Sequence, residues 1–279
     1  MEFRQCSVGG KIYKGQPILP SPTPSQKKLS RGSSGNGSPP GGAQSLTSDG
    51  STAADSSPPI AVNMMQGEIL MPPTLNHNVS VPPVQLSEGV RTHFYDPALL
   101  NDLRAIDAEG HKKLINDFFT ALALCHTVLA SVDPETRGIA YKAQSPDEAA
   151  LVQAAADVGY VFLGREPSSN IVRLQTPTSP TPRRYEMLNV LDFTSVRKRM
   201  SVILKQLDGD GAGTILLLCK GADQVIFDRM ASGQDRMREK IGEDLDVFAN
   251  DGLRTLCLSH RIVSREYCFT FFASLFESR

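Results

Sequence analysis

Asp192-Phe193-Thr194-Ser195-Val196-Arg197-Lys198-Arg199-Met200 is the stretch on which the interpretation of this chain depends. It lies between two alternating apolar runs, 185–191 and 201–207, so one aromatic ring and three consecutive cations fall where two strands are joined. An aromatic face can stack on a base, and guanidinium or ammonium groups can meet phosphate. A core phenylalanine followed by a solvated basic turn fits the same pattern. The rest of the chain has to decide between these two interpretations.

The composition excludes several classes of protein. A formal net charge of -1 over 279 residues argues against a general nucleic-acid-binding surface, so an anion site has to be local. The five cysteines are odd in number and widely spaced, which predicts reduced thiols, and no cysteine or histidine stands at metal-ligand spacing. No apolar run reaches the ~18 residues that a membrane span needs, and no signal-peptide pattern is present. We expect this isolated chain to be soluble and cytoplasmic and to bind no nucleic acid.

The first 92 residues divide into two parts of different composition. Residues 1–15 alternate apolar and polar side chains on either side of Gly9-Gly10, which predicts a short hairpin. Two strands alone are marginal in water, so we expect this hairpin to belong to a larger body. Residues 16–90 hold twelve of the nineteen prolines and no aromatic residue, and so little apolar surface cannot offset chain entropy. We expect 16–92 to be a disordered Pro/Ser/Gly-rich insertion without secondary structure.

An α+β domain is expected over residues 93–263. A wide apolar face at helical spacing predicts a helix over about 109–130. The other predicted helices begin at Pro97, cover 146–157, follow Gly221 as far as Met230, and cover 236–250. The predicted strands are 139–143, 160–164, 171–175, 185–191, 201–207, 214–219 and 255–259. Turns between successive strands favour an antiparallel sheet of about six strands with flanking helices.

The start of the helix at 146–157 carries the first candidate binding residue. In Ser145-Pro146-Asp147-Glu148, serine at the cap, proline at the first helical position and glutamate at the third form a capping box. Glu148 would then only bond back to the first amide of the helix. A glutamate in an exposed first turn can equally face a ligand, and the exocyclic amine of adenine is a donor that it can accept. The sequence does not decide between these roles.

Two further cations lie where strands meet turns. Lys220-Gly221-Ala222-Asp223 ends a strand and opens a helix, so Gly221 allows a close backbone approach and Lys220 adds charge to amides that suit anions. A snorkelling surface lysine beside a turn glycine is the ordinary alternative. Arg254 precedes the last predicted strand, where it can clamp phosphate or simply be a surface arginine.

These motifs, taken in chain order, resemble the nucleotide-binding domain of P-type ATPases. The motifs are Ser145-Pro146-Asp147-Glu148, Phe193 to Met200, Lys220-Gly221-Ala222-Asp223 and Gly252-Leu253-Arg254-Thr255-Leu256. The SPDE and KGAD forms, with Cys125-His126-Thr127-Val128, are similar to the phospholipid-transporting P4 group, the flippases. The resemblance covers roughly 94–262. Residues 1–15 resemble the segment just downstream of the family's phosphorylation motif, and we expect them to be a fragment of the phosphorylation domain edge.

The resemblance implies contacts with ATP. Listed from base to phosphate, Phe193 stacks on adenine, Glu148 lines the base pocket, Lys198 and Met200 flank the base and ribose, Lys220 lies deep in the pocket, and Arg254 reaches the phosphates. Thr194 and Ser195 are implied as hydrogen-bonding neighbours. The set is coherent, because adenine needs a face and an acceptor while the triphosphate needs cations spread over several ångströms.

The departures from the family pattern limit the expected activity. The phosphorylated aspartate of the family's Asp-Lys-Thr-Gly-Thr motif does not occur in this sequence, so we expect the chain alone to be inactive. Mg²⁺ is expected with ATP in the parent protein, at the cytosolic face of a membrane, although we identify no ligands for it here. The implied partners are the remaining phosphorylation, actuator and membrane domains, with an accessory subunit and phospholipid reached only through the parent.

The C-terminal tail, residues 264–279, is unusually aromatic for the family, which suggests unrelated sequence or an amphipathic terminal helix.

Three functions stay open at this point. The chain is a fragment of a flippase that presents ATP to an absent phosphorylation domain, a stand-alone non-catalytic ATP-binding or regulatory module, or a non-functional truncated product.

Overall fold

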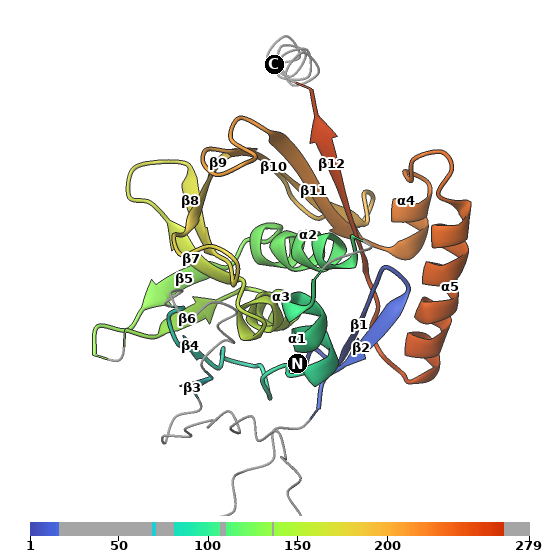
Figure 1. The fold of residues 1–279 in the computed structure, drawn as a ribbon, viewed down its shortest axis with the longest axis horizontal. Coiled ribbons are helices and arrows are strands. Elements are labelled where there is room, and N and C mark those ends of the chain that lie inside the picture. Colours follow the sequence, from blue (N-terminus) through green and yellow to red (C-terminus); the bar gives the residue numbers. More distant parts are fainter. Residues whose placement is uncertain (17–68, 71–80, 107–109, 136, 265–279) are drawn as a thin grey trace, which may run out of the picture. The chain divides into compact units, whose positions relative to one another are not determined.

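The computed structural model describes residues 1–16, 69–70, 81–106, 110–135 and 137–264, and Figure 1 shows how their elements are arranged. The helices are α1 (Pro97–Arg104), α2 (His111–Leu124), α3 (Pro146–Asp157), α4 (Asp223–Phe227) and α5 (Asp235–Asn250). The strands are β1 (Gln5–Val8), β2 (Lys11–Lys14), β3 (Ile69–Leu70), β4 (Val84–Gln85), β5 (Leu129–Val132), β6 (Ile139–Lys142), β7 (Val161–Arg165), β8 (Ile171–Gln175), β9 (Arg183–Leu191), β10 (Arg199–Gln206), β11 (Ile215–Gly221) and β12 (Cys257–Val263).

The central element is a six-stranded antiparallel sheet with the order β12-β11-β10-β9-β8-β7. Its strands follow one another along the chain as a meander, which is what the alternating runs and short turns predict. The sheet curves around α2 in Figure 1. A second sheet has the order β3-β4-β6-β5, in which β4 runs parallel to β6. The expected antiparallel sheet of about six strands with flanking helices is confirmed.

One end of α2 differs from the expectation. The helix ends at Leu124, whereas the apolar pattern predicts helix as far as residue 130. The His126 ring is bonded to the carbonyl of Ala123 at 2.8 Å, which closes the last turn, and Ala130 pairs with Tyr141 in the β5–β6 ladder. A continuous apolar run does not reveal the point at which a buried helix gives way to a strand.

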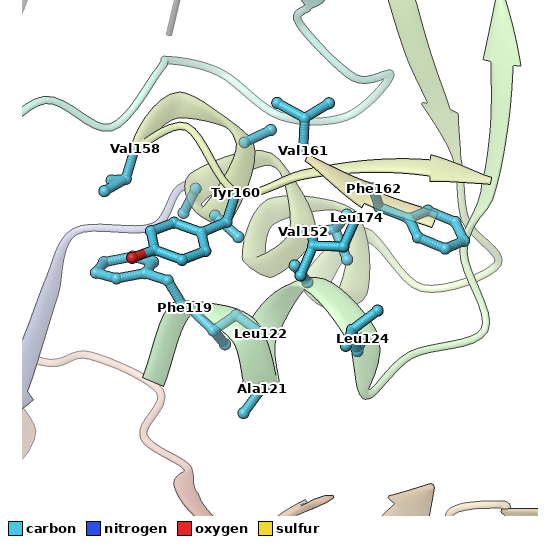
Figure 2. Close-up of a cluster of buried hydrophobic side chains, with 14 of the residues drawn as sticks. Phe119, Ala121, Leu122, Leu124, Val152, Val158, Tyr160, Val161, Phe162 and Leu174 are labelled. Atoms are coloured by element: carbon cyan, nitrogen blue, oxygen red, sulfur yellow. The ribbon is translucent and has the colours of Figure 1, made fainter. Parts of the chain in front are cut away.

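The core lies between α2, α3 and the concave side of the large sheet. Figure 2 shows the rings of Phe119 from α2 and of Tyr160, the residue before β7, lying against each other, with their centroids 5.7 Å apart and their planes 22° from parallel. Both side chains are fully buried, and the Tyr160 hydroxyl donates to Asn116. Aromatic burial of this kind dominates core energetics because each ring removes a large apolar area from water. This packing holds α2 against the start of the large sheet.

The N-terminal hairpin joins the same core. Cys6, Val8 and Tyr13 are 4%, 4% and 0% exposed and belong to the main apolar cluster. The Tyr13 hydroxyl donates to Asp102 of α1. The hairpin is therefore part of the compact unit that contains the sheet, and its assignment to the edge of a phosphorylation domain stays a prediction. Its alternating pattern gave the strands correctly but did not reveal the surface that covers them.

Residues 81–92, which the sequence assigns to the disordered insertion, are part of the fold. Val81, Val84 and Val90 are buried, and Val84 pairs with Ile139 of β6. A buried polar network fastens this segment to α3, because Gln153 accepts from the backbone and hydroxyl of Ser87 at 3.0 and 2.7 Å. Most of the insertion, 17–68 and 71–80, lies outside the described residues, as does the tail 265–279.

Among the residues that the structure describes, no helix combines the length and the apolar character that crossing a bilayer requires.

Candidate functional site

The loop between β9 and β10 presents Phe193 to solvent. The Phe193 side chain is 62% exposed, which excludes the interpretation of a core phenylalanine. The loop is closed on itself, because the Lys198 amide donates to the Thr194 carbonyl at 2.8 Å and the Arg197 amide donates to the Thr194 hydroxyl at 3.1 Å. Lys198 has a φ of 50°, a left-handed conformation that an ordinary residue adopts only when its surroundings impose it. The backbone that carries the Phe193 ring is thus a hydrogen-bonded turn.

The loop is bonded to the strand end that carries Lys220. Met200 of β10 pairs with Lys220 of β11, and the amide of Ala222 donates to the carbonyl of Lys198 at 3.1 Å. Gly221 makes this approach possible, because a Cβ atom at position 221 would lie 2.6 Å from the Lys198 carbonyl oxygen. The loop that carries the exposed ring and the lysine therefore lie at the same end of the sheet, where β9 and β11 end and β10 begins.

Glu148 joins Lys220 rather than capping its own helix. Its Oε1 accepts from Lys220 Nζ at 2.7 Å, and its Oε2 accepts from the Thr127 hydroxyl at 2.7 Å. Ser145 occupies the N-cap position of α3 but makes no side-chain capping bond. The capping box is therefore wrong in both of its bonds. The ion pair links the start of α3 to the end of β11, with side chains 16% and 11% exposed for Glu148 and Lys220.

The charge state of this pair follows from its surroundings. Burial disfavours the ionised carboxylate of Glu148 and by itself would raise its pKa. The Lys220 charge and the hydrogen bonds from Lys220 and Thr127 outweigh that effect, so the pKa of Glu148 lies below its ordinary value. Glu148 is thus an ionised acceptor beside a cation, in a place that is only partly open to water.

The groups beneath the pair are not suited to chemistry. Burial raises the pKa of the Cys125 thiol to about 12, and burial lowers the pKa of His126 to about 4. A thiol without thiolate character is a poor nucleophile, and a neutral buried imidazole does not exchange protons readily near pH 7. Cys125 instead contacts the backbone carbonyls of Met200 and Leu218 at 3.9 and 3.8 Å. This part of the site is packing.

Arg254 is bonded to the residue next to Glu148. Its guanidinium donates to Asp147, the residue before Glu148, and its side chain is 74% exposed. A cavity of about 700 Å³ opens beside it. Apolar side chains from the hairpin and three helices line much of this cavity, among them Phe3, Phe118, Leu122, Ile241 and Phe248. Arg254 thus lines an open cavity together with Asp147, and most of its side chain is exposed.

The comparison with known families decides the identity of this arrangement. Residues 114–275, more than half of the chain, match the family model of the P-type ATPase cytoplasmic domain N. This chain belongs to that family. The match contains all of the candidate site residues and extends to residue 275, and the atypical character of the tail 264–279 stays a prediction.

The curated relatives of this N domain are phospholipid-transporting ATPases. It is 43% identical over 171 residues to Probable phospholipid-transporting ATPase 4 of Arabidopsis thaliana, which covers 59% of this chain and 14% of the relative. It is 42% identical over 173 residues to Phospholipid-transporting ATPase IC of Xenopus tropicalis, covering 62% and 13%. It is 39% identical over 178 residues to Phospholipid-transporting ATPase DNF1 of Saccharomyces cerevisiae, covering 61% and 11%. The resemblance to the phospholipid-transporting group is confirmed, and the chain spans no more than 14% of the length of these relatives.

The structure places the predicted site residues of the N domain in different settings. Phe193, Ser195 and Lys198 are exposed on the β9–β10 loop. Met200 differs from the expectation, because it is 3% exposed and packs in the main core. Alternation along β10 explains this, since Met200 shares the inward face with Val202. Met200 lies under the site and is not on its surface.

Two residues that contact the candidate site were not singled out from the sequence. Thr127 is bonded to Glu148, and Asp147 is bonded to Arg254. Arg197 was named as one of three consecutive cations, but its bonds to carbonyls of its own loop were not predicted. Thr127 stands in the Cys-His-Thr-Val motif, which signals the family but not the contact. Partners of this kind come from elements far apart in sequence, so residue spacing does not reveal them.

Membership in the family implies the use of ATP and Mg²⁺ by the parent proteins. Within the described part of the N domain, no group of three or more His, Cys, Asp or Glu side chains is arranged to hold a metal ion. We therefore assign no protein ligand to Mg²⁺.

Proposed function

We propose that this N domain binds ATP at the β9–β10 loop and presents it to a phosphorylation domain of a phospholipid-transporting P-type ATPase. The observation that carries the proposal is the exposed ring of Phe193 on a loop bonded to the strand end that holds the Lys220–Glu148 pair. An aromatic face and an ion pair at one end of a sheet are the elements that a base and its charged substituents need.

In this proposal, Phe193 stacks on adenine and Glu148 accepts from its exocyclic amine. Oε1 of Glu148 already accepts one hydrogen bond and Oε2 accepts two, but an ionised carboxylate has about four lone-pair sites, so it can accept another. Its lowered pKa keeps it an acceptor at neutral pH. Ser195 and Lys198, exposed on the same loop, are placed to contact the ribose side of the nucleotide.

The phosphates extend toward cationic groups in this proposal. Lys220 lies deeper, paired with Glu148, and Arg254 is the exposed cation next to that pair. Arginine suits phosphate because its planar fork can donate two parallel hydrogen bonds. Mg²⁺ would accompany the phosphates and neutralise part of their charge. The γ-phosphate would then meet its acceptor in the phosphorylation domain, so binding here positions ATP but completes no reaction.

The parent context is part of the proposal. The relatives are phospholipid-transporting ATPases by name, and a chain that contains their N domain fits a role in coupling ATP to lipid movement at the cytosolic face of a membrane. The phosphorylation, actuator and membrane domains, an accessory subunit and the phospholipid would be partners of the parent, not of this domain alone.

Calorimetric titration of the full 279-residue chain with ATP tests the binding site. We expect Phe193→Ala to weaken binding about tenfold or more, because stacking on an aromatic ring contributes ~1–3 kcal/mol per base. Lys220→Ala should lower the affinity for ATP more than the affinity for adenosine. The matched controls are Val196→Ala, which trims an exposed side chain of the same loop, and Lys142→Ala, which removes an exposed cation elsewhere. Unchanged affinity in both Phe193→Ala and Lys220→Ala would refute the proposed site.

A further inference from the structure

Arg197 lies in the middle of the exposed loop, yet its charge is turned inward. Nη1 donates to the carbonyl of Leu191 at 2.9 Å and to the carbonyl of Asp192 at 2.7 Å. Nη2 reaches the hydroxyl of Ser201 at 3.4 Å. Its neighbour Lys198 is exposed, so adjacent cations of the loop are used in opposite ways.

These contacts bridge the neck of the loop. Leu191 is the last residue of β9 to pair with β10, and its partner across the ladder is Ser201. Beyond that pair, the carbonyl of Asp192 has no place in the ladder and needs a donor, as backbone carbonyls generally do. One guanidinium provides donors to both sides of the neck, because its five N–H groups form a rigid fork. Lysine has a single ammonium group and cannot span the neck in the same geometry.

We propose that Arg197 is a positioning residue that holds the Phe193 loop in its base-binding form, and that it does not contact the phosphates. The proposal rests on the proposed function of the loop. The three consecutive cations Arg197-Lys198-Arg199 therefore do not form one phosphate-binding patch. Arg197 closes the neck, the carbonyl of Lys198 fastens the loop to Ala222, and the ring of Phe193 is left projecting into solvent. The loop reaches its binding conformation before the nucleotide arrives, which lowers the ordering cost of binding.

Affinities for adenosine and ATP distinguish positioning from phosphate contact. We expect Arg197→Gln in the full chain to lower the affinities for adenosine and for ATP by the same factor, about tenfold. NMR titration measures both, because it can follow weak binding. A residue that contacts phosphate would instead weaken ATP and spare adenosine, and that result would overturn the proposal. Arg261→Gln, which removes an exposed arginine from β12, is the control for net charge and should change neither affinity.

A double-mutant cycle with Phe193→Ala shows whether Arg197 acts through the ring. In the Phe193→Ala background, Arg197→Gln should cause less than about a twofold further loss, because there is no ring left to position. A tenfold loss in both backgrounds would mean an independent role and would overturn the proposal. Arg197→Lys should retain only part of the wild-type affinity, and full affinity in Arg197→Lys would show that the fork is not required.

Amide exchange supplies a readout that needs no nucleotide. Arg197→Lys should speed the exchange of the Arg197-position and Lys198 amides, which bond to Thr194, while the β10–β11 ladder amides keep their protection. Unchanged exchange in the loop would show that the Arg197 bonds across the neck do not hold the loop, and this would overturn the proposal. The measurement uses Arg197→Lys, so it remains available if Arg197→Gln fails to fold. If the wild-type chain bound neither ligand, the proposed function would fail, and the positioning role with it. If the wild type bound both and the Arg197 variants matched it, only the inference made here would fail.

Discussion

At the scale of single residues, the ion pair between Glu148 and Lys220 makes the stability of the domain depend on pH. The folded-state pKa of Glu148 is lower than its ordinary value of 4.5. A group whose pKa is lowered by folding stabilises the folded state above the unfolded-state pKa, and this contribution is lost as the pH falls through the folded-state pKa. The window therefore lies below about pH 4.5.

We predict that Glu148→Gln removes this part of the acid dependence. Glutamine keeps the size of the side chain but leaves Lys220 without its carboxylate, so the free energy of unfolding at pH 7 should fall by ~1–3 kcal/mol. The measurement is urea denaturation from pH 3 to 7 for wild type and variant, whose curves should converge at the acid end. Glu186→Gln is the control, because that glutamate pairs with Lys205 at an exposed site and 3.6 Å. A constant difference at every pH would contradict the assignment.

The same residue shows why the sequence gives the site only in part. The capping-box pattern at Ser145 and Glu148 predicts a bond inside one helix, but Glu148 bonds Lys220, 72 positions away. Local patterns identify residue types that suit a task, and tertiary packing chooses which task they perform. Phe193 and Lys220 were recognisable as candidates, whereas the inward turn of Arg197 and the burial of Met200 depend on which face of β10 meets the core.

At the scale of elements, the loop and the end of β11 depend on a glycine between them. We predict that Gly221→Ala displaces the Lys198 carbonyl and lowers stability by ~1–3 kcal/mol, because the added Cβ would lie 2.6 Å from that oxygen and from Arg199 Cβ. Nucleotide affinity should fall with it, since the loop that carries Phe193 has to move. Thermal denaturation and an ATP titration measure the two effects.

Gly242→Ala is the matched control for this substitution. Gly242 lies inside α5 with no atom within 4 Å of an added Cβ, so alanine there should stabilise the chain by roughly 0.5–1 kcal/mol. Opposite signs for the two glycine substitutions are the expected result. If Gly221→Ala were also neutral or stabilising, the close approach between β11 and the loop would not hold in solution.

Elements were easier to predict than their ends and their neighbours. The strands of the large sheet and the helix α5 follow from their apolar patterns, whereas α3 follows from the proline at its first position and the glycine after its end. The change from α2 to β5 was missed, since both carry apolar residues through a buried stretch. The two residues of β4 were missed because two prolines come directly before them, and only pairing with β3 and β6 makes them a strand.

At the scale of the whole molecule, the sequence suggests a domain that begins near residue 93, but the core includes the hairpin that precedes the insertion. Tyr13 is fully buried, and its hydroxyl is bonded to Asp102 and lies 2.7 Å from His111 Nε2. Residues at the two sides of the insertion are also joined, because the amide of Gln16 donates to the carbonyl of Tyr95 at 2.8 Å. These contacts make the hairpin part of the folding unit and not an appendage.

Substitutions at Tyr13 therefore measure how strongly the hairpin is coupled to the rest of the fold. We predict that Tyr13→Ala costs ~3–5 kcal/mol, because it removes a fully buried ring, and that Tyr13→Phe costs ~1.5–3 kcal/mol, because it removes only the hydroxyl with its bonds to the Asp102 carboxylate and to His111. Tyr95→Phe, at a residue 39% exposed, should stay within ~0.5 kcal/mol of wild type. Fluorescence and circular dichroism should report one coincident transition in each variant, since a single core unfolds together. A Tyr13→Ala variant as stable as wild type would mean that the hairpin detaches freely, and the core would then have to be redrawn to begin at Val81.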